Sequence, residues 1–318
     1  MYAPSALHIP DGFLTPLVAS VGWILAGGLV GLALRQTRQQ LRERQVPVMG
    51  VLAAFIFAAQ AINFPVAAGT SGHLIGAALA AILLGPWGGL LVMTAVVSVQ
   101  ALLFQDGGLI VMGWNILNMG ALGALSAYGV YRLAMRLVGA HRAGRLAAAF
   151  AAAWVSVEVG AMAAAIELAV SGTAALDLAL PAMAGVHALI GVGEGIITVG
   201  AVGLISSSRP ALLDQAEVAP GRSSAYLVIA GLVVALGLAL LSPLASGDPD
   251  GLNAVAETLG FARLDAAREW APLAGYRLPG LENPASATMV AVAAGTLIVF
   301  GAAVVVGRWL RPRRPAPE

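Results

Sequence analysis

The stretch FLTPLVASVGWILAGGLVGLAL, residues 13–34, decides the fold class of this chain. It carries no charged side chain and is as long as the roughly 20 apolar residues that a transmembrane helix needs. Similar runs recur, so that 59% of the 318 residues are hydrophobic and only 10% are charged, against about 25% in a soluble domain. A backbone exposed to lipid must satisfy its own hydrogen bonds, which favours helices. We therefore expect an all-α polytopic protein of the cell (inner or plasma) membrane. We expect it to contact the lipid bilayer and not to bind nucleic acid.

The apolar runs predict a helical bundle of about nine segments. Their approximate bounds are 13–34, 48–64, 73–85, 87–104, 112–133, 146–170, 182–205, 224–243 and 286–308. The third segment is short and is followed by Gly-Pro-Trp-Gly-Gly at 85–89, so it is either a partial span or one arm of a tight hairpin with the fourth. Residues 1–12 lack the basic and apolar regions of a signal peptide.

Arginines predict the orientation of the bundle. The chain has no lysine, and 14 of its 17 basic residues fall on one side if all nine segments cross. They lie in the linkers 35–45 and 132–145, at Arg209 and Arg222, and in 308–314. Because basic residues favour the cytoplasmic side, we expect the N-terminus outside and the C-terminus in the cytoplasm. His8 and the loop before His73 then share the outer face.

These two histidines are the candidate metal ligands. The chain has no cysteine, so a metal must take nitrogen or oxygen ligands, and imidazole suits nickel, cobalt, copper or zinc. Either histidine alone could serve a turn or a helix start, but the pair on one face predicts a shared site. Asp11, Asn63 and Ser71 lie close enough in sequence to orient the imidazoles, or they have ordinary turn and cap roles.

A second pair of residues leaves two interpretations open. His187 and Glu194 are seven residues apart and share a helix face, and ionisable groups within spans are functional candidates. They could equally form a hydrogen bond that locks helices together. The sequence GTSG at 69–72 also matches the GxSG of rhomboid-type intramembrane proteases, with Ser71 as nucleophile and His187 as base. That enzyme is the rival function.

Several motifs in order resemble the CbiM/NikM family, the substrate-binding membrane subunits of energy-coupling factor (ECF) transporters for cobalt and nickel. The motifs are HIPDGFL at 8–14, NFPV at 63–66, GTSGHLIG at 69–76, FQDGG at 104–108, Asn115 with Asn118, and HALIG at 187–191 before Glu194. The resemblance covers residues 7–205, with roughly seven segments. Residues 223–310 resemble a CbiN/NikN-like PDGLE module of two segments, with PDGLN at 249–253 and an outer insert at 244–285. Residues 206–222 would be a cytoplasmic linker and 311–318 a basic cytoplasmic tail.

The resemblance implies Ni²⁺ or Co²⁺ as the transported substrate. The implied ligands are the amide and ring nitrogens of His8, the ring of His73 and the amine of residue 7, a planar nitrogen set that suits these ions. It also implies partners, namely an ECF transmembrane coupling subunit and two cytosolic ATPase subunits. This chain has no Walker A motif, so we expect no bound nucleotide and no enzymatic activity. The small residues Gly27, Gly28 and Gly31 are a candidate docking surface.

The sequence departs from the family pattern at Leu7. A nitrogen inside the chain is an amide rather than an amine, and Met1 to Ala6 precede this residue. We hypothesise that translation starts at codon 7, within a metal-binding segment 1–12. Proteolytic trimming and a site lacking one ligand are the alternatives. The resemblance includes His187, Glu194, Asn115 and Asn118 without assigning them a role.

Overall fold

The computed structural model describes residues 8–40, 45–67, 69–139, 141–213, 223–266 and 271–311. Within these ranges the protein is mostly helical, with one two-stranded antiparallel hairpin. Six helical stretches there are long and apolar enough to cross a membrane. The protein is therefore an all-α polytopic membrane protein, as its composition predicts. Leu7, the first part of the segment 1–12, most of the linker 206–222 and most of the tail 311–318 lie outside the described residues.

The elements follow the apolar runs with shifted ends. The long helices are α1 (Pro16–Gln40), α3 (Ala77–Val99), α6 (Arg142–Val170), α7 (Leu176–Ser208), α8 (Ser223–Leu241) and α10 (Pro284–Leu310). The shorter ones are α2 (Gln45–Gln60), α4 (Met112–Asn115), α5 (Gly123–Val138) and α9 (Gly251–Leu259). Two π-helical stretches, η1 (Gln100–Phe104) and η2 (Ile116–Leu122), follow α3 and α4. Single 3₁₀ turns are η3 (Pro210–Leu212), η4 (Ser242–Leu244), η5 (Ala262–Leu264) and η6 (Ala274–Tyr276).

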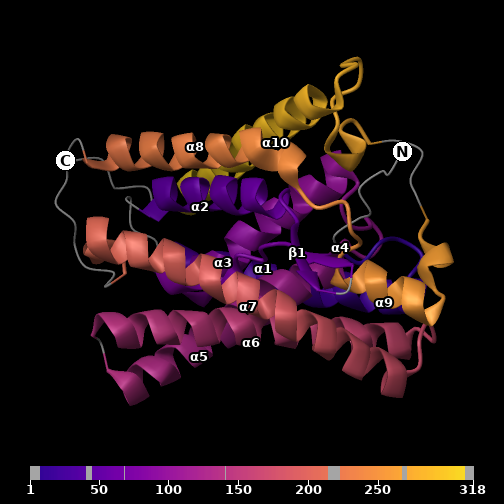
Figure 1. The fold of residues 1–318 in the computed structure, drawn as a ribbon. Helices are drawn as coiled ribbons and strands as arrows, with labels where there is room; N and C mark the ends of the chain where they lie inside the picture. The colour runs from indigo at the N-terminus through magenta and orange to yellow at the C-terminus, as the bar shows by residue number, and fades with distance from the viewer. Residues whose placement is uncertain are drawn as a thin grey trace.

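The helices form two outer groups on either side of the central helix α3 (Figure 1). α2, α8 and α10 pack together on one side, and α5, α6 and α7 pack together on the other. α3 lies between them and contacts both groups, and its buried residues are almost all aliphatic, alanine or glycine. The two helices of the C-terminal unit thus pack mainly on α2, which belongs to the N-terminal unit.

α3 contains a sharp break at Gly85. Its φ of 77° and ψ of 170° are outside the helical region and are open essentially to glycine alone. A Cβ atom at Gly89 would lie 3.0 Å from the backbone nitrogen of Ala81, eight residues earlier, so the chain folds back on itself. The segments expected at 73–85 and 87–104 are therefore the arms of a tight hairpin, which was one of the two alternatives. The first arm begins at Ala77 rather than at residue 73.

The apolar run 48–64 does not stay helical to its end. α2 stops at Gln60, and Phe64 begins strand β1 (Phe64–Ala67), which pairs with β2 (Thr70–Gly72). The prediction was wrong here because Pro65 disfavours a helical conformation at Phe64, the residue before it. The run 112–133 is also interrupted, since η2 separates α4 from α5. Apolar character alone did not distinguish these irregular stretches from regular helix.

The two ends of the bundle differ in composition. β1, α4 and α9 lie in the right-hand half of the bundle in Figure 1. Arginines lie at the opposite ends of the helices, with Arg38 in the last turn of α1, Arg136 in the last turn of α5 and Arg308 in the last turn of α10. This separation agrees with the arginine pattern of the sequence. Assignment of the arginine-rich end to the cytoplasm stays a prediction.

The break at Gly85 gives a first testable prediction. Gly85→Ala should lower the free energy of unfolding by about 1–3 kcal/mol, because a Cβ atom is strained at this φ and ψ. The measurement is thermal unfolding of the detergent-solubilised protein. Gly237→Ala, within α8 and with no atom within 4 Å of the added Cβ, is the control and should not be destabilised. Equal stability of the two variants would mean that the chain does not reverse at Gly85.

Candidate metal centre

Three of the four histidines line one cavity of about 80 Å³. His8 comes from the segment before α1, His73 from the chain between β2 and α3, and His187 from α7. The lining also includes Asn115, Asn118 and Asp250. The structure therefore brings together the two predicted imidazoles. It also places His187, from the N-terminal unit, and Asp250, from the C-terminal unit, in the wall of the same cavity.

The rings of His8 and His73 are close neighbours. Their centres are 5.6 Å apart and their planes meet at 87°. A metal–nitrogen bond of about 2.0–2.1 Å puts two rings that share an ion roughly 4–6 Å apart between centres, so this spacing fits one ion. Within the described ranges no group of three or more His, Asp or Glu side chains has a metal-binding arrangement. The backbone nitrogens of His8 and Leu7, which the family resemblance implies, are the candidates for further ligands, and Leu7 lies outside the described residues.

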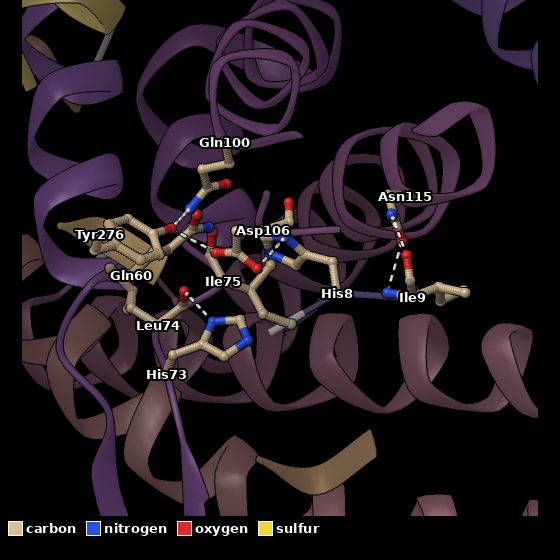
Figure 2. Close-up of polar contacts among 10 residues, drawn as sticks. All are labelled: His8, Ile9, Gln60, His73, Leu74, Ile75, Gln100, Asp106, Asn115 and Tyr276. Carbon is tan, nitrogen blue, oxygen red and sulfur yellow. Dashed lines mark hydrogen bonds and ion pairs between the residues drawn. The ribbon is translucent and has the colours of Figure 1, made fainter. Parts of the chain in front are cut away.

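His8 is held by Asp106 on one side of its ring. Nδ1 lies 3.3 Å from the Asp106 carboxylate and 3.4 Å from the Asp106 carbonyl oxygen (Figure 2). Nε2 is buried and has no hydrogen-bond partner within the described ranges. Metal-bound histidines usually have this arrangement, with one ring nitrogen on an oxygen acceptor and the other on the ion. In the sequence, Asp106 stands within the motif FQDGG, and that motif did not indicate a role for it.

The backbone after His8 is fixed by two polar side chains. The Asn115 side chain accepts from the Ile9 N–H at 3.1 Å and donates to the Ile9 carbonyl at 3.0 Å. The Asp11 carboxylate accepts from the N–H groups of Leu109, Ile110 and Val111 at 2.8–3.3 Å. Asp11 thus has the turn-and-cap role, and its carboxylate binds these backbone N–H groups rather than an imidazole. Asn115 now has a role that the sequence did not assign.

His73 is held through the backbone that follows it. Its Nδ1 lies 3.0 Å from the Leu74 carbonyl oxygen (Figure 2). The Glu194 carboxylate accepts from the N–H groups of Ile75 and Gly76 at 2.6 and 2.8 Å. His187 does not pair with Glu194, since its Nδ1 lies 2.8 Å from the Met183 carbonyl oxygen one turn earlier in α7. His187 and Glu194 therefore do not form the helix-locking hydrogen bond with each other. Glu194 instead fixes the backbone that follows His73, an interaction called the Glu194 clamp below.

Ser71 binds the C-terminal unit. Its hydroxyl donates to the Asp248 carbonyl at 2.8 Å, and its N–H donates to the Pro249 carbonyl at 2.8 Å. Asn63 donates to the Ser71 hydroxyl at 3.4 Å. Ser71 is fully buried and, unlike His187, does not line the cavity. Among the described residues, Ser71 and His187 thus do not form the hydrogen-bonded pair that a protease mechanism needs, and Asn63 and Ser71 join two chain units rather than orient an imidazole.

Asn118 completes the polar part of the cavity wall. It lies in η2, a π-helical stretch of the kind often found at functional sites. Its side-chain amide donates to the Glu167 carboxylate of α6 at 3.0 Å, while its own side-chain oxygen is buried and has no partner in the described part of the chain. An acceptor thus lies buried in the cavity wall next to the predicted ligands.

Two titratable groups of the insert 244–285 reach the same region. Asp250 caps α9 by accepting from the Asn253 N–H at 2.8 Å, and burial raises its pKa to about 8. The Tyr276 hydroxyl donates to the Asp106 carboxylate and accepts from the Gln100 amide at 3.1 Å (Figure 2). Burial, together with the neighbouring Asp106, raises the pKa of Tyr276 well above its ordinary value. The phenol therefore remains a hydrogen-bond donor at neutral pH.

Comparison with known proteins identifies the family. Residues 8–212 match the family model CbiM, the cobalt uptake substrate-specific transmembrane region. The chain belongs to the CbiM family. Residues 225–312 match the PDGLE domain, so a CbiM-type region is fused here to a CbiN/NikN-like module. The motifs at 8–14, 69–76 and 249–253 carried this resemblance in the sequence.

Known relatives share this organisation. A protein of Archaeoglobus fulgidus that carries the name of a fused nickel transport protein NikMN is 36% identical over 307 residues, which are 96% of this chain and 99% of that protein. The fused nickel transport protein NikMN of Rhodobacter capsulatus is 32% identical, over 74% of this chain and 73% of that protein. A solved structure described as a truncated transition metal transporter matches with a TM-score of 0.56 at 30% identity, covering 66% of this chain and 100% of its own.

The Glu194 clamp gives the second prediction. Glu194→Ala should lower the free energy of unfolding by about 1–3 kcal/mol, because two buried N–H groups lose their acceptor. Glu194→Gln keeps one acceptor oxygen and should have an intermediate effect. Thermal unfolding in detergent measures both, with Glu257→Ala on the exposed part of α9 as the control. A stability of Glu194→Ala equal to that of the control would argue against the clamp.

Proposed function

We propose that this chain is the substrate-specific subunit of an ECF-type ABC importer that captures Ni²⁺ or Co²⁺. The observation that carries the proposal is the pair of imidazoles, His8 and His73, whose ring centres lie 5.6 Å apart at one cavity. Family membership and the names of the relatives, which refer to nickel or cobalt transport, support the choice of ion. Nitrogen ligands suit both ions.

The proposed capture step uses the geometry around the two rings. Asp106 holds one side of the His8 ring, and Glu194 fixes the backbone after His73. Because both rings are held by neighbouring groups, an entering ion would exchange its water for preset nitrogen ligands with little rearrangement of the protein. The His8 amide and the nitrogen of Leu7 remain proposed additional ligands, and Leu7 lies outside the described residues.

A chelate ring formed by the amide and imidazole of one histidine would use Nδ1. In this structure Nδ1 of His8 faces Asp106, and Nε2 is buried with no hydrogen-bond partner among the described residues. The proposed chelate therefore requires Nδ1 of His8 to exchange its contact with Asp106 for the ion.

Translocation requires partners in this proposal. The chain would bind no nucleotide, and a transmembrane coupling subunit with two cytosolic ATPase subunits would drive import. The small-residue face of α1 supports such docking. A Cβ added at Gly27, Gly28 or Gly31 would meet no atom within 4 Å, so within the described residues these glycines do not serve packing inside this chain. Large apolar side chains beside them, including Leu25 and Leu32, are exposed.

The metal-binding proposal is tested by metal analysis of the purified protein with intact mass. Wild type should retain about one Ni²⁺ or Co²⁺ per chain, and His73→Ala should lose most of it, because one of two imidazoles is gone. His141→Ala is the matched control, since His141 caps α6 outside the cavity by accepting from the Gly144 N–H. Equal metal loss in both variants, or no metal in wild type, would overturn the proposal. Peptide cleavage abolished by Ser71→Ala would favour the protease instead.

Assembly with the coupling subunit gives a separate prediction. Gly27→Leu or Gly31→Leu should reduce co-purification of the partner subunits and metal uptake, because a large side chain prevents close helix contact. Metal binding by the isolated chain should be unchanged. Gly129→Leu, at an equally open position on α5, is the control. Normal assembly of the α1 variants would exclude this face as the docking surface.

A further inference from the structure

We propose that His187 is a relay ligand, which holds the ion briefly as the ion passes between solvent and the His8–His73 pair. The inference rests on the proposed function, since it assumes that this pair binds Ni²⁺ or Co²⁺. His187 thereby gains a role that neither its motif nor the proposed function assigns to it.

The first observation is the position of His187 on α7. Met183, His187 and Ile190 are spaced by four and three residues and all line the cavity, so they lie on one face of the helix. Met183 and Ile190 are buried, whereas His187 is half-buried. The His187 ring thus borders the same space as His8 and His73 while part of its surface stays accessible.

The second observation concerns the two ring nitrogens of His187. Its Nδ1 lies 2.8 Å from the Met183 carbonyl oxygen. A carbonyl oxygen can only accept, so Nδ1 carries a hydrogen, and in the neutral ring the lone pair is on Nε2. Metal-binding histidines commonly have this arrangement, with a backbone carbonyl as the acceptor. A neutral His187 can therefore bind an ion through Nε2 without first losing a proton.

The third observation is the glycine that faces this ring. A Cβ atom at Gly251, the first residue of α9, would lie 2.8 Å from Cε1 and 3.1 Å from Nε2 of His187. The space beside Nε2 therefore exists because residue 251 has no side chain. Gly251 and its neighbours Asp250 and Leu252 line the cavity. Glycine at this position keeps the Nε2 edge of His187 open toward the cavity.

The cavity has room for a second ion position. Its volume is about 80 Å³, and a single water needs about 10–15 Å³, so an ion fits together with several waters. Within the described ranges no three His, Asp or Glu side chains form a metal-binding group. His187 is therefore not a third permanent ligand of the pair, and it would hold the ion at a neighbouring position.

A relay ligand changes rates rather than affinity. An ion bound by several nitrogens leaves by exchanging them one at a time, and imidazole suits Ni²⁺ and Co²⁺ well. A third imidazole at the cavity supplies a replacement before the next bond breaks, and it does the same in reverse during entry. His187 thus lowers the barrier in both directions and leaves the equilibrium affinity of the His8–His73 pair unchanged.

The test measures the Kd and the release rate of Ni²⁺ on the full, detergent-solubilised chain, with excess EDTA added to start release. His187→Ala should keep the Kd within about twofold and slow release about tenfold, because only the barrier changes. His141→Ala, outside the cavity, is the matched control and should change neither. Failure of wild type to bind Ni²⁺ would refute the proposed function itself.

Three results would refute the relay alone, provided that wild type binds Ni²⁺. Unchanged release in His187→Ala would show that the ion does not use this ring. Faster release would indicate that His187 only packs against the site and keeps it closed. A Kd raised more than about tenfold would make His187 a permanent ligand.

A second variant separates ligation from packing. His187→Phe keeps a ring and removes the nitrogens, so it should release Ni²⁺ as slowly as His187→Ala. Free imidazole can fill the space left in His187→Ala and should restore fast release there, but not in His187→Phe, where the new ring occupies that space. Wild-type release by His187→Phe, or equal acceleration of all variants by imidazole, would overturn the proposal.

Discussion

Buried backbone that is not helical has to find hydrogen-bond partners within the protein, and the region around the cavity depends on this constraint. The chain before α1, the loop 106–111 and the stretch after β2 all lack the internal pairing of a helix. Three side chains, those of Asp11, Asn115 and Glu194, satisfy their backbone groups. The same bonds place the residues that carry chemistry, because His8 and His73 are each within three positions of a backbone group tied in this way.

The C-terminal unit contributes directly to this arrangement. Asp248 and Pro249 accept both hydrogen bonds from Ser71, and the Ser246 N–H donates to the Asn63 carbonyl at 2.8 Å. Asp250 lies in the cavity wall, while Tyr276 reaches the Asp106 carboxylate. Two family regions that match separately along the sequence therefore share one set of polar contacts. Fusion into one chain keeps the two partners of each contact at a fixed ratio and at high effective concentration.

The sequence predicted those features that depend on local composition. Apolar runs predicted most of the helices, and motifs around His8 and His73 predicted a pair that the structure places side by side. The break at Gly85 could be predicted as one of two alternatives because glycine and proline are adjacent there. Contacts between residues that are distant in the sequence could not be predicted. Ser71 is 177 positions from Asp248, and Asp106 is 170 positions from Tyr276. A short polar motif such as GTSG or FQDGG does not indicate which distant residue its side chains will bind. For that reason the sequence left Ser71 as a possible nucleophile and gave no role to Asp106.

The hairpin in α3 also bears on how the chain threads the bilayer. Its first arm, from Ala77 to the break at Gly85, rises only about 12 Å, well short of the roughly 30 Å hydrocarbon layer. Its second arm returns toward the end of the bundle at which Asp106 meets His8. A hairpin that enters and leaves the bilayer on the same side adds either two membrane crossings or none. It therefore does not change whether the total number of crossings is odd or even. The relative orientation of every other helix is therefore independent of how deeply this hairpin penetrates.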